Sequence, residues 1–355
     1  MGLLAVLPVL NWVLSPVAFS LTDSQRLFST DLLHGYFNRF LYHQGISADS
    51  QRVLVGRQGW LFDANEDHQL RDPSAVDVKS HDSPLQIKKS VRELKQRQQW
   101  MTERGIMTLL VIVPDKRSIY SEYAPELGHS SKQNATDTFM ASARSTSLNV
   151  LDLRGQLLPK KSDSDPLYFR TDSHWNHYGA YLGYRDSIAA INEIYGAQIK
   201  KVDPVKRQWV RRAAGNLAQQ LKFDGLLDID VDRDVELSFA GSEATLCIQV
   251  LAVKNLAPRG KCEDTRNRSI TVDRHPYASL NQKAINRMNV VWIRDSFGNF
   301  NSALYQQTFS RLWEIHHQQF SRMDWRVIVE RLNADLVIYQ VAEGAIDNMT
   351  VDESK

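Results

Sequence analysis

The stretch Arg170–Ala180, which reads RTDSHWNHYGA, decides how this chain is interpreted. It brings an acid, two histidines, an indole and an amide together, just before a helical pattern that starts at Tyr178. A second stretch, Val291–Gly298, reads VWIRDSFG and places a serine at the end of an apolar run. Serine, histidine and an acid are the groups that acyl transfer through a covalent intermediate needs. The two stretches therefore predict one shared site.

Three of these residues form a candidate catalytic triad. Ser296 is the candidate nucleophile, because it follows an apolar strand and ligands gather at the carboxyl ends of strands in open α/β sheets. The alternative role for Ser296 is a cap of the next helix. His174 is the candidate base, and Asp172 is the acid that orients it, since residues i and i+2 of an extended segment project to one side. Gly298 permits a tight turn, and the backbone N–H groups that follow the serine are candidate oxyanion donors.

Four neighbouring residues are candidates for binding the substrate or stabilising an oxyanion. Asn176 is either an oxyanion donor or a cap of the helix that begins at Tyr178. Trp175 and Tyr178 are expected to pack around the imidazole or to form a platform for a sugar. Arg294, just before the Asp-Ser pair, completes this group.

A metal site is the alternative interpretation of the first stretch. Asp172, His174 and His177 are residue types that form three-ligand sites with open positions. The pair His316-His317 is a possible source of a fourth ligand. Nothing else in the sequence suggests a metal, and no metal or other cofactor is predicted.

The composition excludes two broad classes of protein. With 355 residues, 43% apolar and 24% charged, the chain has the composition of an ordinary globular protein rather than a disordered one. Its 43 basic and 41 acidic residues leave a formal charge of +2, which is too balanced to suggest a nucleic-acid partner.

The N-terminal stretch Leu3–Ser20 carries no charged residue. Its length is near the lower limit of roughly 17–25 residues for a membrane-spanning helix, although Pro8 and Pro16 weaken the pattern. An export or membrane-anchor segment is the favoured interpretation, and a buried helix is the alternative. If the chain is exported, a disulfide between Cys247 and Cys262 is expected to stabilise it by roughly 3 kcal/mol.

Strand and helix patterns alternate along most of the chain, which predicts an α/β layer fold with a mainly parallel sheet. Two small strands around a glycine turn are expected at 52–62, and an irregular loop at 66–83. The longer expected strands are 107–113, 150–153, 289–293, 311–315 and 335–341. The expected helices are 27–42, 84–105, 136–144, 178–195 and 324–333. Region 202–283 breaks the rhythm with short pieces at 236–239 and 245–251, and is interpreted as an insertion on the rim of the sheet.

These residues resemble a known family, the alginate O-acetyltransferase AlgJ/AlgX family of exported SGNH-hydrolase-like proteins, also described as DHHW proteins. The Asp172-Ser-His174-Trp175-Asn176 block is the most specific match, and Arg294-Asp-Ser296-Phe-Gly298 is its later partner. Supporting matches, in the same order along the chain, are 53–62, 113–116, 151–153 and the closing strand 334–343.

The resemblance implies a three-layer α/β/α fold and a triad of Ser296, His174 and Asp172. It also implies transfer of acetyl groups to an extracellular polysaccharide, supplied through a membrane-bound O-acyltransferase partner. Together with the uncharged N-terminal stretch, this predicts a location in the periplasm, at the inner membrane. The predicted organisation is a signal or anchor segment (1–20), a helical linker (21–50), the SGNH-like domain (51–345) and a tail (346–355).

The chain departs from the family at several positions. Gln340 and Glu343-Gly344 stand where relatives often carry an acid and Glu-Arg, and Arg294 stands where many SGNH proteins have glycine. Region 202–283 shows no match, so the sequence does not name the polysaccharide. Two alternative functions remain open. One is an esterase with the same triad, and the other is a non-catalytic scaffold that binds sugars on Trp60, Trp175 and Trp292.

Overall fold

The fold is seen in a computed structural model of the chain. It describes residues 2–15, 22–64, 84–125, 135–162, 164–226, 232–239, 245–266, 268, 270–272 and 274–349. The loop predicted at 66–83 lies outside these residues, as do residues 16–20 of the uncharged N-terminal stretch.

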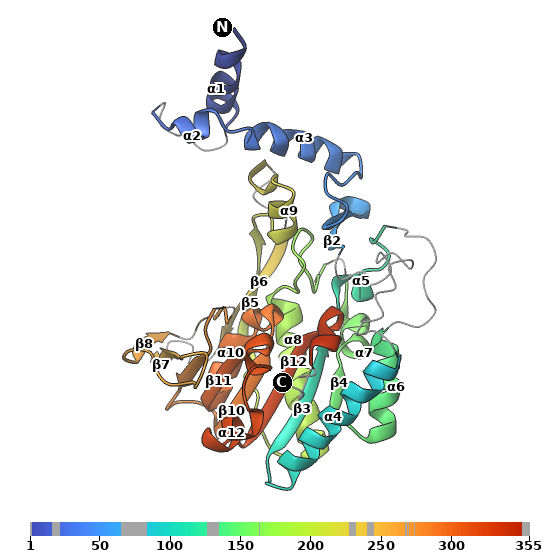
Figure 1. Cartoon of the computed structure of the whole chain (residues 1–355), viewed down its shortest axis with the longest axis vertical. Coiled ribbons are helices and arrows are strands. Elements are labelled where there is room, and N and C mark those ends of the chain that lie inside the picture. The colour runs from blue at the N-terminus through green and yellow to red at the C-terminus, as the bar shows by residue number, and fades with distance from the viewer. Residues whose placement is uncertain are drawn as a thin grey trace.

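An eight-stranded sheet forms the centre of the molecule (Figure 1). The first five strands in spatial order are parallel, and their apolar runs are typical of strands that are buried on both faces. The last three are antiparallel, so the sheet is mixed and the prediction of a mainly parallel sheet needs this correction. In spatial order the strands are β4 (Val150–Asp152), β3 (Met107–Val113), β12 (Leu336–Ala342), β10 (Asn286–Arg294), β11 (Phe309–His316), β9 (Tyr277–Leu280), β7 (Thr245–Val250) and β8 (Glu263–Arg266).

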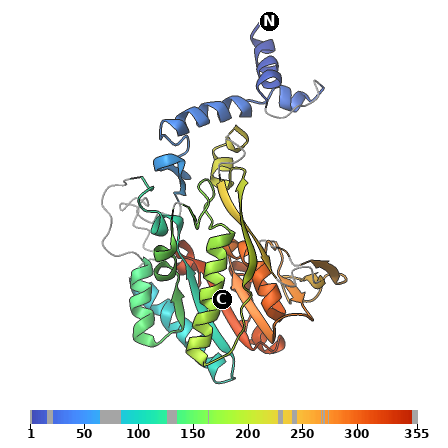
Figure 2. The same ribbon diagram turned by 180° about the vertical axis from the view of Figure 1, so that it is seen from behind.

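Helices cover both faces of the sheet and make three layers. Successive residues of a strand point to opposite faces, so Leu109 and Val111 of β3 pack on the side of α8 (His177–Tyr195), while Leu110 and Ile112 pack on the other side. Figure 1 shows that other side, and Figure 2 shows the α8 side. The other side carries α4 (Pro84–Thr102), α6 (Ala135–Thr146) and α12 (Trp325–Arg331). The α8 side also carries α10 (Ser302–Thr308).

Short helical segments connect these layers, mostly at the loops. They are α5 (Lys116–Ile119), α7 (Arg154–Leu157), η2 (Leu158–Lys160), η3 (Asp224–Leu226), η4 (Ser296–Phe300), α11 (His317–Phe320) and η5 (Glu343–Met349).

The N-terminal helices lie away from the sheet (Figures 1 and 2). They are α1 (Gly2–Leu14), α2 (Ser24–Leu27) and α3 (Asp31–His43), the last of which was expected at 27–42. In α1, Val9, Trp12 and Val13 are each more than half exposed, so the buried-helix alternative is wrong. Across the described ranges, no helix combines the length and apolar character that crossing a membrane requires.

A small hairpin joins the N-terminal helices to the main body. As predicted, β1 (Val53–Val55) and β2 (Leu61–Asp63) pair around a glycine-containing turn, η1 (Arg57–Gly59). Gly59 has a φ of +76°, which favours glycine, and an added Cβ would lie 2.4 Å from the Tyr42 hydroxyl. The Leu61 N–H donates to the carbonyl of Arg170 at 2.9 Å, which anchors the start of the RTDSHWNHYGA stretch to the hairpin.

Region 202–283 takes two forms. Strands β7, β8 and β9 extend the edge of the main sheet, and a disulfide between Cys247 and Cys262 links β7 to the loop before β8. By contrast, β5 (Pro204–Arg212) and β6 (Asp232–Phe239) form a separate antiparallel ribbon, with α9 (Asn216–Gln220) between them in the chain. Because β6 packs against α8, this ribbon lies beside the predicted site. The interpretation of region 202–283 as an insertion on the rim of the sheet therefore does not describe the ribbon.

Candidate active site

The three predicted catalytic side chains meet at one end of the sheet. His174 Nε2 lies 2.8 Å from Ser296 Oγ, and His174 Nδ1 lies 2.7 Å from Asp172 Oδ1. All three groups are within hydrogen-bond reach in the order nucleophile, base and orienting acid. The prediction that Ser296 lies beside His174 and Asp172 is therefore confirmed, although Ser296 follows His174 by 122 residues in the sequence.

Ser296 is placed by the end of β10. The strand stops at Arg294, and Asp295 accepts hydrogen bonds from the Phe297 N–H at 3.0 Å and from the Ala342 N–H at 2.6 Å. The helix cap at this junction is thus Asp295, and the Ser296 hydroxyl is directed toward His174. Burial raises the pKa of Asp295 above its ordinary value, although both N–H bonds and the nearby His174 act against that shift.

Asp172 is held as an ionised carboxylate. Burial by itself favours a raised pKa, but hydrogen bonds from His174 and from the Asn216 N–H, at 2.9 Å, bring the pKa of Asp172 below its ordinary value. A carboxylate only accepts hydrogen bonds, so His174 Nδ1 carries a proton toward it. Nε2 is then the ring nitrogen available to take the proton of Ser296.

Hydrogen bonds from a buried lysine fix the position of the loop that carries Asp172 and His174. The buried ammonium of Lys116 donates to the carbonyls of Phe169, Arg170 and Asp172, at 3.2, 3.2 and 2.6 Å. Gly215 lies so close that an added Cβ would sit 2.3 Å from the Cβ of Asp172. The backbone position of Asp172 is therefore fixed by contacts from distant parts of the chain.

We expect Lys116→Met to destabilise the protein and misplace the catalytic loop. Three hydrogen bonds to backbone carbonyls are lost, and at roughly 1 kcal/mol for each the free energy of unfolding should fall by about 3 kcal/mol. Denaturant unfolding measures this loss. The control is Lys160→Met, which removes only an ion pair with Asp186 near the surface and should cost about 1 kcal/mol or less. Equal losses in both variants would contradict the anchoring role of Lys116.

Comparisons with known proteins assign the chain to a family. A family model described as "SGNH hydrolase-like domain, acetyltransferase AlgX" matches residues 53–234. The chain belongs to this AlgX family. A probable alginate O-acetylase AlgJ of Pseudomonas aeruginosa is 27% identical over 206 residues, which is 58% of this chain and 49% of that protein. An AlgJ of Pseudomonas putida is 30% identical over 141 residues, or 39% of this chain and 34% of that protein. The chain thus spans about half, or less, of the length of these curated relatives.

Solved structures show the same fold at low sequence identity. Bacillus cereus PatB1 has a TM-score of 0.61 at 15% identity, covering 84% of this chain and 99% of that one. The O-acetyltransferase domain of Pseudomonas putida AlgJ has a TM-score of 0.52 at 17% identity, covering 85% and 94%. The SGNH-hydrolase-like α/β fold of this AlgX-family chain is therefore shown.

Within this AlgX-family site, three of the four candidate binding residues are structural. Trp175 is fully buried and donates from Nε1 to the Phe297 carbonyl at 2.9 Å, which joins the two halves of the site. Asn176 caps α8 with its carbonyl oxygen and donates its amide group to Pro166 and Arg233, so the oxyanion role is wrong. Tyr178 alone of the four remains partly exposed.

Arg294 is buried beneath the serine rather than open to substrate. Its guanidinium donates to Glu314 at 3.0 and 2.8 Å, and neither side chain is exposed. Gly298 is required here by space, because an added Cβ would lie 2.2 Å from the Cδ of Arg294. The Phe297 and Gly298 N–H groups both donate to Asp295, so they do not fit the predicted oxyanion role.

The metal and scaffold alternatives lose their support. His177 is paired with Asp234 instead of joining Asp172 and His174, and burial lowers the pKa of His317 to about 4. Throughout the residues that the structure describes, no cluster of three or more His, Cys, Asp or Glu side chains is arranged to hold a metal. The sugar platforms proposed for a scaffold, Trp60, Trp175 and Trp292, are all buried.

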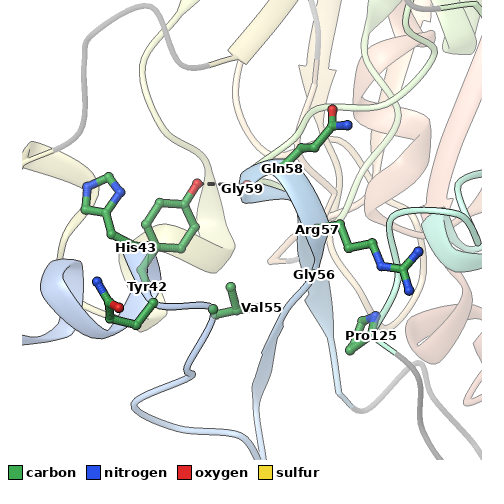
Figure 3. Close-up of a pocket in the computed structure, with 10 residues that line it drawn as sticks. Tyr42, His43, Val55, Gly56, Arg57, Gln58, Gly59 and Pro125 are labelled. Atoms are coloured by element: carbon green, nitrogen blue, oxygen red, sulfur yellow. Dashed lines mark hydrogen bonds between the residues drawn. The ribbon is translucent and has the colours of Figure 1, made fainter.

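A depression of about 710 Å³ lies between the end of α3 and the β1–β2 hairpin (Figure 3). The Tyr42 hydroxyl donates to the Gly59 carbonyl at 2.8 Å along its wall. Figure 3 shows the side chains of His43, Arg57 and Gln58 pointing in different directions rather than converging. Binding sites usually gather a few polar groups around one point, and the triad does not line this depression, so we assign no chemistry to it.

Sequence reasoning missed several residues of this site. Asn216 and Gly215 contact Asp172, and the Asp232 carboxylate accepts from the backbone N–H groups of Arg170 and Thr171, at 2.5 and 3.0 Å. These residues lie in region 202–283, where no local pattern connects them to the catalytic loop. Only the three-dimensional structure shows that these residues contact the catalytic loop.

Proposed function

We propose that the protein is an O-acetyltransferase that moves acetyl groups to hydroxyls of a bacterial exopolysaccharide, with Ser296 as nucleophile. The observation that carries the proposal is the continuous hydrogen-bonded chain from Ser296 Oγ through His174 to Asp172. The relatives named as probable alginate O-acetylases support the choice of acetyl transfer. The matched segments cover only 58% and 39% of this chain, so these relatives do not specify its polymer.

In the first half-reaction Ser296 Oγ attacks the carbonyl carbon of the acetyl donor. His174 Nε2 takes the serine proton and passes it to the leaving group, and an acetyl ester forms on Ser296. Asp172 stabilises the imidazolium that appears between these steps. The Ser296 N–H is the first of η4 and has no acceptor within that helix, so it is a candidate donor to the oxyanion.

In the second half-reaction His174 removes a proton from a sugar hydroxyl, which attacks the acetyl carbonyl. The ester on Ser296 breaks, and the serine oxygen recovers its proton from His174. Water in place of the sugar gives hydrolysis, the esterase alternative. A non-catalytic scaffold has less support, because such a role does not need a serine 2.8 Å from a histidine nitrogen.

Trapping the intermediate tests the proposal directly. The full chain is incubated with p-nitrophenyl acetate, quenched in acid, digested and examined by mass spectrometry. We expect one acetyl group on the peptide that contains Ser296, and its release when an oligosaccharide acceptor is added before the quench. Acetylation elsewhere, with Ser296 unmodified, contradicts the assignment. Release by water at the same rate with and without sugars favours the esterase.

We also propose that the protein works in the periplasm at the inner membrane, with acetyl groups supplied through a membrane-bound O-acyltransferase. The support is the uncharged helix α1 with its exposed apolar side chains Val9, Trp12 and Val13. A phosphatase reporter that works only after export, fused after Lys355, is expected to be active. Deletion of residues 1–22 is expected to abolish that activity, and equal activity of both fusions would contradict the role of this segment.

A further inference from the structure

The buried Arg294 guanidinium uses every one of its N–H groups next to the turn that carries the nucleophile. Nε and Nη2 donate to Glu314 Oε2 at 3.0 and 2.8 Å, and Nη2 also donates to the Ile270 carbonyl at 2.6 Å. Nη1 donates to the Asp295 carbonyl at 3.0 Å and to Asn299 Oδ1 at 2.7 Å. The N–H groups of a guanidinium lie in one fixed plane, so these bonds together fix its orientation.

Glu314, the charged partner of Arg294, is itself held in place. The Ser302 hydroxyl donates to its two carboxylate oxygens at 2.9 and 2.8 Å, and Gln306 Nε2 donates to Oε1 at 3.2 Å. Ser302 and Gln306 belong to α10, and Glu314 belongs to β11. The position of the guanidinium is therefore determined by α10 and β11 as well as by its own strand.

The bond from Arg294 to the Asp295 carbonyl affects the chemistry because that carbonyl shares a peptide unit with the Ser296 N–H. A trans peptide unit is planar, so its C=O and N–H point in opposite directions. The Asp295 carbonyl faces the guanidinium and also accepts from the Gly298 N–H at 3.2 Å. The Ser296 N–H consequently points away from the guanidinium, and no group among the described residues accepts a hydrogen bond from it.

We propose that Arg294 is a positioning residue for acetyl transfer, which directs the Ser296 N–H toward the oxyanion by holding the Asp295 carbonyl. The oxyanion is the negative oxygen that forms on the acetyl carbonyl when Ser296 Oγ attacks it. A donor that is already oriented stabilises this charge without reorganising during the reaction. The inference rests on the proposed function, because it concerns the transition state of that reaction, and it adds a role for a buried ion pair in the rate of acylation.

The variant Arg294→Lys tests this role. Lysine keeps the positive charge opposite Glu314, but its ammonium has three donors and no planar arrangement, so it cannot replace all the bonds of the guanidinium. We expect the maximal rate of acylation by p-nitrophenyl acetate to fall about tenfold to a hundredfold, with little change in KM. Removal of a whole oxyanion donor costs about 10²–10³, and the loss here is smaller because the Gly298 N–H still holds the carbonyl.

A second substrate distinguishes a misdirected N–H from a fold that is merely less stable. In the thionoester O-(4-nitrophenyl) ethanethioate, C=S replaces the C=O of p-nitrophenyl acetate. Sulfur is a weak hydrogen-bond acceptor, so an oriented N–H favours reaction of the oxygen ester over the thionoester. We expect Arg294→Lys to lower the ratio of the two acylation rates several-fold. Partial unfolding would lower both rates by the same factor and leave the ratio unchanged.

Arg154→Lys is the matched control, because it makes the same change in an arginine that binds Asp152, Asp137 and Glu343 instead. It should keep the wild-type ratio of rates. An unchanged ratio in Arg294→Lys, or an equal fall in both variants, overturns the positioning role.

A double variant covers the case in which Arg294→Lys does not fold. Arg294→Met/Glu314→Gln removes both charges together, so no buried charge is left without its partner. The same fall in the ratio is expected, and an unchanged ratio overturns the role. The proposed function is judged separately by the acetyl group on Ser296 of the wild type. If that group forms while the ratio does not respond to these variants, only the role of Arg294 is wrong.

Discussion

The variant Ser296→Ala is expected to lose acetyl transfer almost completely, by a factor on the order of 10⁶ where the triad acts as one unit. The methyl group cannot form the acetyl ester, and His174 loses the hydroxyl that lies 2.8 Å from its Nε2. Release of p-nitrophenol from p-nitrophenyl acetate, followed with and without an oligosaccharide, measures the loss. The fold should survive, because Asp295 caps η4 and Ser296 does not.

The double variant Ser296→Ala/His174→Ala sharpens this expectation. Residues that act together lose activity non-additively, so the double variant should be little slower than either single variant. The control is Ser302→Ala, a serine that donates to Glu314 in the core and lies outside the triad. Strictly additive losses, or an active Ser296→Ala enzyme, would remove Ser296 from the mechanism. A chelator that inactivates the wild type would instead revive the metal alternative.

The parallel half of the sheet and the triad were predictable because their signals are local. An apolar run such as Met107–Val113 marks a buried strand by itself. Asp172 and His174 lie in one short stretch, and Ser296 follows the apolar run of β10, so the chemistry of each stretch was visible without its partner. Parallel strands then bring their carboxyl ends to one edge of the sheet.

The roles of Arg294 and Trp175 were not predictable for the opposite reason. Each is polar or amphipathic enough to be a binding residue, and its burial depends on a distant partner. Arg294 is neutralised by Glu314 on the neighbouring strand β11, and Trp175 fits against α8 because Gly183 leaves room for its ring. In the same way, the pairing of β5 with β6 places Asp232 and Asp234, and the spacing of residues in the sequence does not predict that pairing.

The second large effect is expected from Asp172→Asn, which should lower the rate by on the order of 10⁴. The amide has nearly the shape of the carboxylate, but its nitrogen is a donor. It would face His174 Nδ1 and favour the tautomer with the proton on Nε2, which cannot accept from Ser296. Pre-steady-state release of p-nitrophenol measures the acylation step alone. Because Asn216 and His174 donate backbone N–H groups to Asp172, an asparagine oxygen can still accept one of them.

A pH series on the same variant separates charge from shape. The pKa of Asp172 is lowered on folding, so its ionisation adds stability that is fully present above roughly pH 4 and is lost as the pH falls through the folded value. Asp172→Asn has no such group, so its free energy of unfolding should depend less on pH in the acid range than that of the wild type. Asp203→Asn is the control: it removes another carboxyl with a lowered pKa, but one that pairs with Lys201 at the surface, and it should keep full acetyl transfer. A rate loss in Asp172→Asn of less than about tenfold would mean that Asp172 supports the loop without setting the tautomer of His174.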